Sequence, residues 1–105
     1  MIDTLKQMLG IGPTIDFAEL KNQGAQIIDV RSPGEYAQGH IHGSINIPLQ
    51  NLPKQLSKIN KDKPVITCCA SGMRSATAKG IFQSHGFAQV HNGGGWQGLK
   101  SKLEK

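Results

Sequence analysis

The chain has 105 residues, which is enough for one domain with a single core and too few for two. Its formal net charge of +5 is carried almost entirely by lysines without interleaved aromatic residues, which argues against nucleic-acid binding and is typical of a solvated face or of a field that attracts small anions. The two cysteines are adjacent, so they do not form a disulfide framework, and the lack of a long apolar run predicts a cytoplasmic protein that does not enter a membrane.

The first residues predict two short helices. We expect residues 1–13 to form an N-terminal extension of a single domain, with a short helix over residues 3–9 that glycine and proline end. Thr14 or Asp16 is expected to cap a second helix over residues 17–22, because either side chain has an oxygen that accepts a backbone N–H.

Residues 26–59 alternate between strand and helix patterns. β-branched residues predict strands over residues 26–30 and 44–47. Between them, Ser32 is followed by a proline and then by a glutamate three positions on, which predicts a capped helix start. Apolar residues at helical spacing predict a further helix over residues 49–59.

The second half of the chain repeats this alternation. Residues 64–68 form a short apolar run that predicts a buried strand, and a helix is expected over residues 75–85. A short strand over residues 89–91, a turn over residues 93–95 and a last helix from about Trp96 complete the pattern. Strands alternating with helices indicate an α/β fold, with a mostly parallel sheet covered by helices on both faces.

Cys69 follows the central apolar strand, and a short loop then leads into a helix. In such sheets ligands bind beyond the carboxyl ends of the strands. Backbone N–H groups of the loop and the positive end of the helix favour an anion, and a thiolate is one. Gly72 permits close backbone approach, and Arg74 carries a guanidinium suited to oxyanions. These residues predict that Cys69 is a reactive nucleophile rather than an inert core residue.

Four segments of the chain resemble, in order and spacing, the motifs of single-domain rhodaneses, a family of sulfurtransferases. The resemblance covers roughly residues 15–103. The segments are Ile28–Pro33 with Glu35 and Tyr36; Gly39–Ile41 with Gly43, Ser44 and Asn46–Pro48; Cys69–Ser75; and Val90 with Gly93–Trp96. The resemblance implies a single-domain rhodanese-like fold with a central, mostly parallel five-stranded sheet.

The resemblance also implies the chemistry. Cys69 would be the catalytic residue, forming a persulfide with a sulfur taken from a small anionic donor such as thiosulfate, or from a low-molecular-weight or protein persulfide. The sulfur would pass to a thiol acceptor, either a small molecule or a protein such as thioredoxin. No metal and no organic cofactor would be needed. The substrate-binding residues would be those of the loop: Ala70, Ser71, Gly72, Met73, Arg74 and Ser75.

Two departures from the family pattern affect this interpretation. Ala70 stands where thiosulfate-using members often have a basic residue, which favours a persulfide donor over thiosulfate. Cys68 stands where an aromatic residue is common, and it is either a small buried residue or a resolving thiol for oxidised Cys69.

Cys68 also leaves a second function open. Counted from Cys68, five residues precede Arg74, the spacing of cysteine-dependent phosphatases and arsenate reductases; counted from Cys69 there are four, the spacing of sulfurtransferases. Thr67 stands where the phosphatases commonly have histidine, which favours the shorter count. A non-catalytic sulfur carrier is a third possibility.

The remaining candidates are expected to be structural. Family members use the arginine at the end of the loop to bind backbone carbonyl groups, so we expect Arg74 to hold the loop rather than the donor. Asp29 and Arg31 are expected to form a structural ion pair. His40 and His42 have no converging partners in the sequence, so no metal site is predicted.

Overall fold

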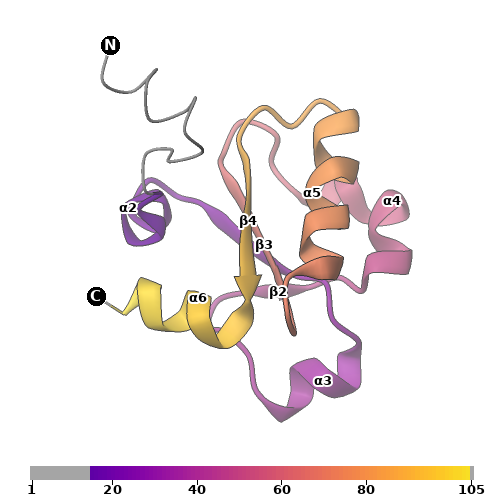
Figure 1. Cartoon of the computed structure of the whole chain (residues 1–105). Coiled ribbons are helices and arrows are strands. Elements are labelled where there is room, and N and C mark those ends of the chain that lie inside the picture. The colour runs from indigo at the N-terminus through magenta and orange to yellow at the C-terminus, as the bar shows by residue number, and fades with distance from the viewer. Residues whose placement is uncertain (1–14, 105) are drawn as a thin grey trace, which may run out of the picture.

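Four parallel strands form the centre of the fold, with helices on both sides (Figure 1). The structure, a computed structural model, describes residues 15–104; the expected extension over residues 1–13, its helix over residues 3–9 and the Thr14 cap lie outside them. The elements in chain order are α2 (Phe17–Asn22), β1 (Gln26–Asp29), α3 (Pro33–Gln38), β2 (Ile45–Asn46), η1 (Leu49–Asn51), α4 (Leu52–Gln55), η2 (Leu56–Lys58), β3 (Val65–Cys69), α5 (Met73–Ser84), β4 (Val90–Gly95) and α6 (Trp96–Leu103).

The strand order is β2-β1-β3-β4, and each neighbouring pair is parallel. The described residues therefore contain four strands, where the family resemblance implied five. The four segments whose composition predicted strands are those that form them, and the rest of residues 15–104 is helical or connects these elements.

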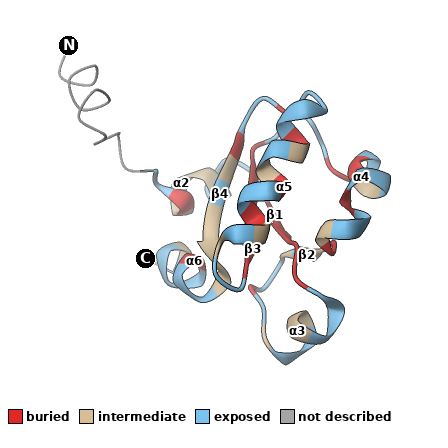
Figure 2. Ribbon diagram, turned by 45° about the vertical axis from the view of Figure 1, so that its right-hand side comes forward, coloured by how far each residue is buried: buried red, intermediate tan, exposed pale blue. Residues whose placement is uncertain are grey.

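Alternating side chains divide the core into two layers, one on each face of the sheet. On one face, Ile28 packs with Leu52 of α4 and Phe82 of α5. On the other, Ile27 packs with Phe17 of α2 and Leu99 of α6. Figure 2 shows the buried segments running through β1 and β3 and along the sides of the helices that face them. The expected covering of both sheet faces is confirmed.

The two predicted helix starts are confirmed by their caps. Asp16 accepts the N–H of Glu19 at 3.0 Å and starts α2. Ser32 and Glu35 form a reciprocal capping box that starts α3.

Two predictions of local structure are wrong in detail. The segment over residues 49–59 is not one helix but the series η1, α4 and η2, because Pro53 has no N–H to continue an α-helical ladder from η1. The predicted turn over residues 93–95 belongs instead to β4. A side chain at Gly93 would come within 2.7 Å of Leu99 Cδ2 and 2.8 Å of the Thr67 carbonyl oxygen, so glycine lets the strand run on against β3.

Candidate active site

The two adjacent cysteines at the end of β3 lie in different layers of the core. Both are fully buried. Cys69 belongs to the layer that contains α4 and α5, and Cys68 belongs to the layer that contains α2 and α6. Successive residues of a strand point to opposite faces, so neither thiol is placed to bond to the other. This geometry disfavours Cys68 as a resolving thiol and supports its interpretation as a small buried residue.

Backbone N–H groups converge on the sulfur of Cys69. Gly72 N–H donates to Sγ at 2.9 Å, and Ser75 N–H lies 3.4 Å from it. The loop can fold back in this way because Gly72 adopts a left-handed conformation, with φ of 108°, and acts as the N-cap of α5. The helix starts at Met73, two residues before the predicted start, so Ser75 is already in its first turn.

These contacts determine the ionisation of Cys69. Burial raises the pKa of its thiol, but hydrogen bonds from the Ser75 hydroxyl and from the backbone N–H groups of Ser75, Gly72 and Ser71 outweigh burial, and the pKa lies below its ordinary value. Donors that stabilise the anion make the sulfur a better nucleophile near neutral pH.

Cys68 has the opposite environment. Its neighbours in the core layer are apolar, and among residues 15–104 no hydrogen bond reaches its sulfur. Burial, together with the nearby carboxylate of Asp29, raises the pKa of Cys68 to about 12. The longer loop count of the phosphatases would require Cys68 as the nucleophile, and this environment disfavours it.

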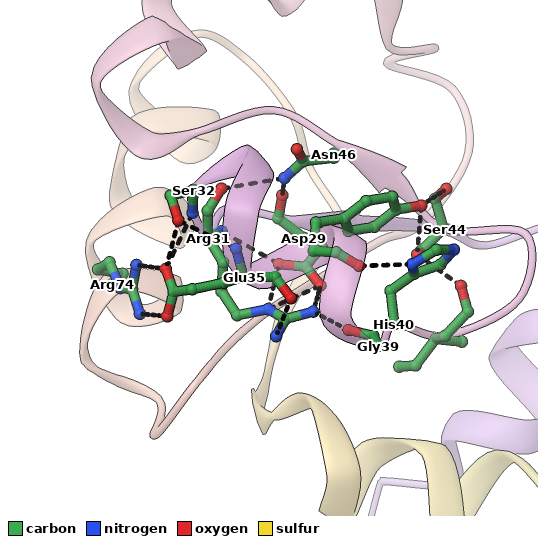
Figure 3. Close-up of polar contacts among 11 residues, drawn as sticks. Asp29, Arg31, Ser32, Glu35, Gly39, His40, Ser44, Asn46 and Arg74 are labelled. Atoms are coloured by element: carbon green, nitrogen blue, oxygen red, sulfur yellow. Dashed lines mark hydrogen bonds and ion pairs between the residues drawn. The ribbon is translucent and has the colours of Figure 1, made fainter.

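Arg74, the second residue of α5, binds a side chain of α3 and not, as expected, the backbone carbonyl groups of its own loop. Its guanidinium makes a two-point ion pair with Glu35, with Nη1–Oε1 at 2.8 Å and Nη2–Oε2 at 3.0 Å (Figure 3). Glu35 is held in turn by Ser32 through the capping box. The bonds to Arg74 and Ser32 lower the pKa of Glu35 to about 2, so the pair is fully charged at neutral pH. The pair ties α5 to α3 and neutralises the cation of the loop.

Asp29 and Arg31 form the predicted structural pair. Arg31 Nη2 lies 2.8 Å from Asp29 Oδ2, and both side chains are buried. Arg31 also donates to the backbone oxygens of Glu35 and Gly39, at 3.3 and 2.6 Å, and its guanidinium lies 4.8 Å from the centre of the Trp96 ring. The pair therefore fixes α3, and with it the carboxylate that receives Arg74.

Asn92 of β4 contacts the loop, and sequence reasoning did not identify it. Its Oδ1 accepts a hydrogen bond from Ser75 Oγ at 2.6 Å and another from the Gly94 N–H at 2.9 Å. Its Nδ2 lies 3.4 Å from the Gly72 oxygen. No motif or spacing in the sequence relates Asn92 to a loop some twenty residues earlier; only the pairing of β3 with β4 brings them together.

The other candidate residues take surface positions. Ala70, Ser71 and Met73 are exposed, and 80% of Met73 is accessible at the rim of the loop. His40 stacks on Tyr36, with ring centres 3.8 Å apart. Within residues 15–104 no group of three or more histidine, cysteine, aspartate or glutamate residues is placed to hold a metal ion. None of the helices in that range is long and apolar enough to cross a membrane.

Residues 14–102 match the family model described as the Rhodanese-like domain. The uncharacterized protein YqhL of Bacillus subtilis is 41% identical over 68 residues, which are 65% of this chain and 54% of YqhL. The thiosulfate sulfurtransferase GlpE of Stutzerimonas stutzeri is 34% identical over 73 residues, covering 70% of this chain and 67% of GlpE. The structure is similar to that of a rhodanese with anions from E. coli, with a TM-score of 0.67, 36% identity and coverage of 70% of this chain and 89% of that one. The chain thus spans between half and two thirds of the length of these two sequence relatives.

Proposed function

Because this chain belongs to the rhodanese-like domain family, we propose that it is a sulfurtransferase whose nucleophile is Cys69. The observation that carries the proposal is the set of N–H groups converging on Cys69 Sγ, from Gly72 at 2.9 Å and Ser75 at 3.4 Å. The relative GlpE, which is named a thiosulfate sulfurtransferase, supports the same reaction class.

The reaction has two steps and needs no external oxidant or reductant. The Cys69 thiolate attacks the outer sulfur of the donor, a new S–S bond forms, and the donor's own bond to that sulfur breaks. The leaving group departs with the electron pair, as sulfite from thiosulfate or as a thiolate from an organic persulfide. An acceptor thiolate then attacks the outer sulfur of the Cys69 persulfide, which releases the Cys69 thiolate for another cycle. Neither step draws on a metal or an organic cofactor.

The residues Ala70 to Ser75 form the binding loop in this proposal. In this proposal the N–H groups that stabilise the thiolate also stabilise the persulfide, because the inner sulfur of the persulfide is the same Sγ. Arg74 positions the loop rather than the donor, since Glu35 occupies both of its terminal nitrogens.

The choice of donor follows from the charges around the loop. Thiosulfate carries two negative charges, but Ala70 is uncharged and Arg74 is already neutralised by Glu35. We therefore propose that organic persulfides, of low molecular weight or on a protein, react more readily than thiosulfate. The acceptor is a thiol, either a small molecule or a protein such as thioredoxin.

Intact mass spectrometry tests the proposal. The reduced protein is exposed to thiosulfate or to glutathione persulfide, desalted and weighed, alongside the variants Cys69→Ser and Cys68→Ser. We expect a gain of one sulfur atom that Cys69→Ser abolishes and Cys68→Ser retains. Loss of the gain in Cys68→Ser alone, together with hydrolysis of an aryl phosphate, would support the phosphatase interpretation. Loading without repeated turnover to any thiol would indicate a sulfur carrier.

A further inference from the structure

The hydroxyl of Ser75 has one proton and three neighbours that compete for it. Its Oγ lies 3.5 Å from Cys69 Sγ, 3.0 Å from the Gly72 carbonyl oxygen and 2.6 Å from Asn92 Oδ1. The shortest of these contacts is the one to Asn92. The group that accepts the hydrogen bond of the Ser75 hydroxyl therefore decides whether this hydroxyl is a donor or an acceptor towards the sulfur.

Both ends of the Asn92 amide are engaged. Oδ1 accepts from Ser75 and from the Gly94 N–H, and Nδ2 faces the Gly72 carbonyl oxygen at 3.4 Å. Asn92 thus contacts the residue that caps α5 as well as the serine in its first turn. These are also the two residues whose N–H groups lie nearest to the sulfur.

We propose that Asn92 is a positioning residue for sulfur transfer: it holds the Ser75 hydroxyl beside the Cys69 sulfur and accepts the hydrogen bond of that hydroxyl while Cys69 is a thiol. The proposal rests on the proposed function of Cys69 as the nucleophile. Asn92 itself makes no hydrogen bond to the sulfur.

The movement of hydrogen bonds follows from the inventory of donors. While Cys69 is a thiol, its S–H donates to Ser75 Oγ, and Ser75 donates to Asn92 Oδ1. When Cys69 becomes a thiolate or a persulfide anion, the Ser75 O–H turns to the sulfur. Asn92 Oδ1 is not left without a donor, because the Gly94 N–H still reaches it at 2.9 Å. The turn therefore costs one hydrogen bond and leaves no buried polar atom unpaired.

The charged groups around Cys69 do not change in this scheme. They are Arg74 on α5, the Glu35 carboxylate of α3 that pairs with it, and the Asp29–Arg31 pair beyond Cys68. None of them contacts Asn92, so an Asn92 variant shifts the midpoint through Ser75 or through Gly72, and the Ser75→Ala background distinguishes the two.

The test measures the ionisation of Cys69 directly. The rate of alkylation by iodoacetamide is recorded against pH in the full chain with Cys68→Ala, which leaves a single thiol. Four versions are compared: Asn92 intact, Asn92→Ala, Ser75→Ala and the double variant. Asn92→Asp serves as a variant of nearly the same shape, in case the alanine variant does not fold. Sulfur loading from glutathione persulfide is measured in parallel.

We expect Asn92→Ala to lower the alkylation midpoint by up to about one pH unit, because the Ser75 hydroxyl then loses the acceptor that competes with the thiolate for its hydrogen bond. Asn92→Asp should raise the midpoint instead and slow loading at neutral pH, because a carboxylate accepts the Ser75 hydrogen bond more strongly and adds a negative charge near the sulfur. In the Ser75→Ala background, Asn92→Ala should produce no additional shift.

Two results would overturn the proposal: an unchanged midpoint in Asn92→Ala and Asn92→Asp, or the same shift with and without the Ser75 hydroxyl. A merely structural role would lower stability without moving the midpoint. Alkylation does not require sulfur transfer. If the proposed function is wrong, the midpoints of the variants still shift as expected, but the protein never gains a sulfur atom from the donor.

Discussion

The difference between the two adjacent thiols gives the most direct test of the structure. Burial raises the pKa of Cys68 to about 12, while hydrogen bonds to the sulfur hold the pKa of Cys69 below its ordinary value. At pH 7.5 the thiolate fraction of Cys69 should exceed that of Cys68 at least about a thousandfold. A more basic thiolate is intrinsically more nucleophilic. Across three units of pKa, this makes the Cys68 thiolate roughly twenty- to thirtyfold more reactive than the Cys69 thiolate and offsets part of the difference in ionisation. The net expectation is that Cys69 reacts at least about thirty times faster.

Competitive alkylation measures this ratio. The native protein is treated with a limiting amount of iodoacetamide at pH 7.5, and fragmentation of the peptide over residues 64–74 locates the label. In concentrated urea the two thiols should react alike, because the hydrogen bonds to one and the apolar cover of the other are both lost. Comparable labelling of Cys68 and Cys69 in the native protein would refute the reasoning, and so would a large preference that persists in urea.

Three further predictions concern stability. The pKa of Glu35 is lowered to about 2 from an ordinary 4.5, so its ion pair stabilises the fold above pH 4.5 and this stabilisation is lost as the pH falls towards 2. The urea midpoint should therefore drop more steeply between pH 4.5 and 2 in the native protein than in Glu35→Gln. Parallel curves for the two proteins would contradict this. Arg31→Met leaves the buried carboxylate of Asp29 without its partner and should lower the free energy of unfolding by about 3–5 kcal/mol in chemical denaturation. Asp29→Asn combined with Arg31→Met should lower it clearly less. Equal losses in the two proteins would count against a buried ion pair. Gly93→Ala should destabilise the fold by about 1–3 kcal/mol, because the added methyl group lies within 3.0 Å of neighbouring atoms. Gly98→Ala, in α6 with open space around it, should stabilise the fold by up to about 1 kcal/mol. Thermal melts that do not distinguish the two variants would refute the close packing at Gly93.

The elements of the fold were predictable because their signals are local. Asp16 and Ser32 begin helices through hydrogen bonds to residues three positions on, and β-branched runs form the strands. The Asp29–Arg31 pair was also accessible, since its members are two residues apart. Where local prediction failed, a single residue overrode the pattern: Pro53 interrupts the apolar helical stripe, and Gly93 extends a strand where a turn was expected.

The sequence by itself determined the fold class and the segment that carries the reactive cysteine, because both depend on residue types at short, fixed spacing. The tertiary structure decided which partner each of these residues meets. It gave Arg74 a carboxylate from α3 instead of the backbone of its own loop, and it brought Asn92 from β4 to Ser75. It also distinguished Cys69 from Cys68, because the alternation of a strand turns one thiol towards a ring of N–H groups and the other into apolar packing. Contacts of this kind depend on which strands lie side by side, and that is a property of the folded chain.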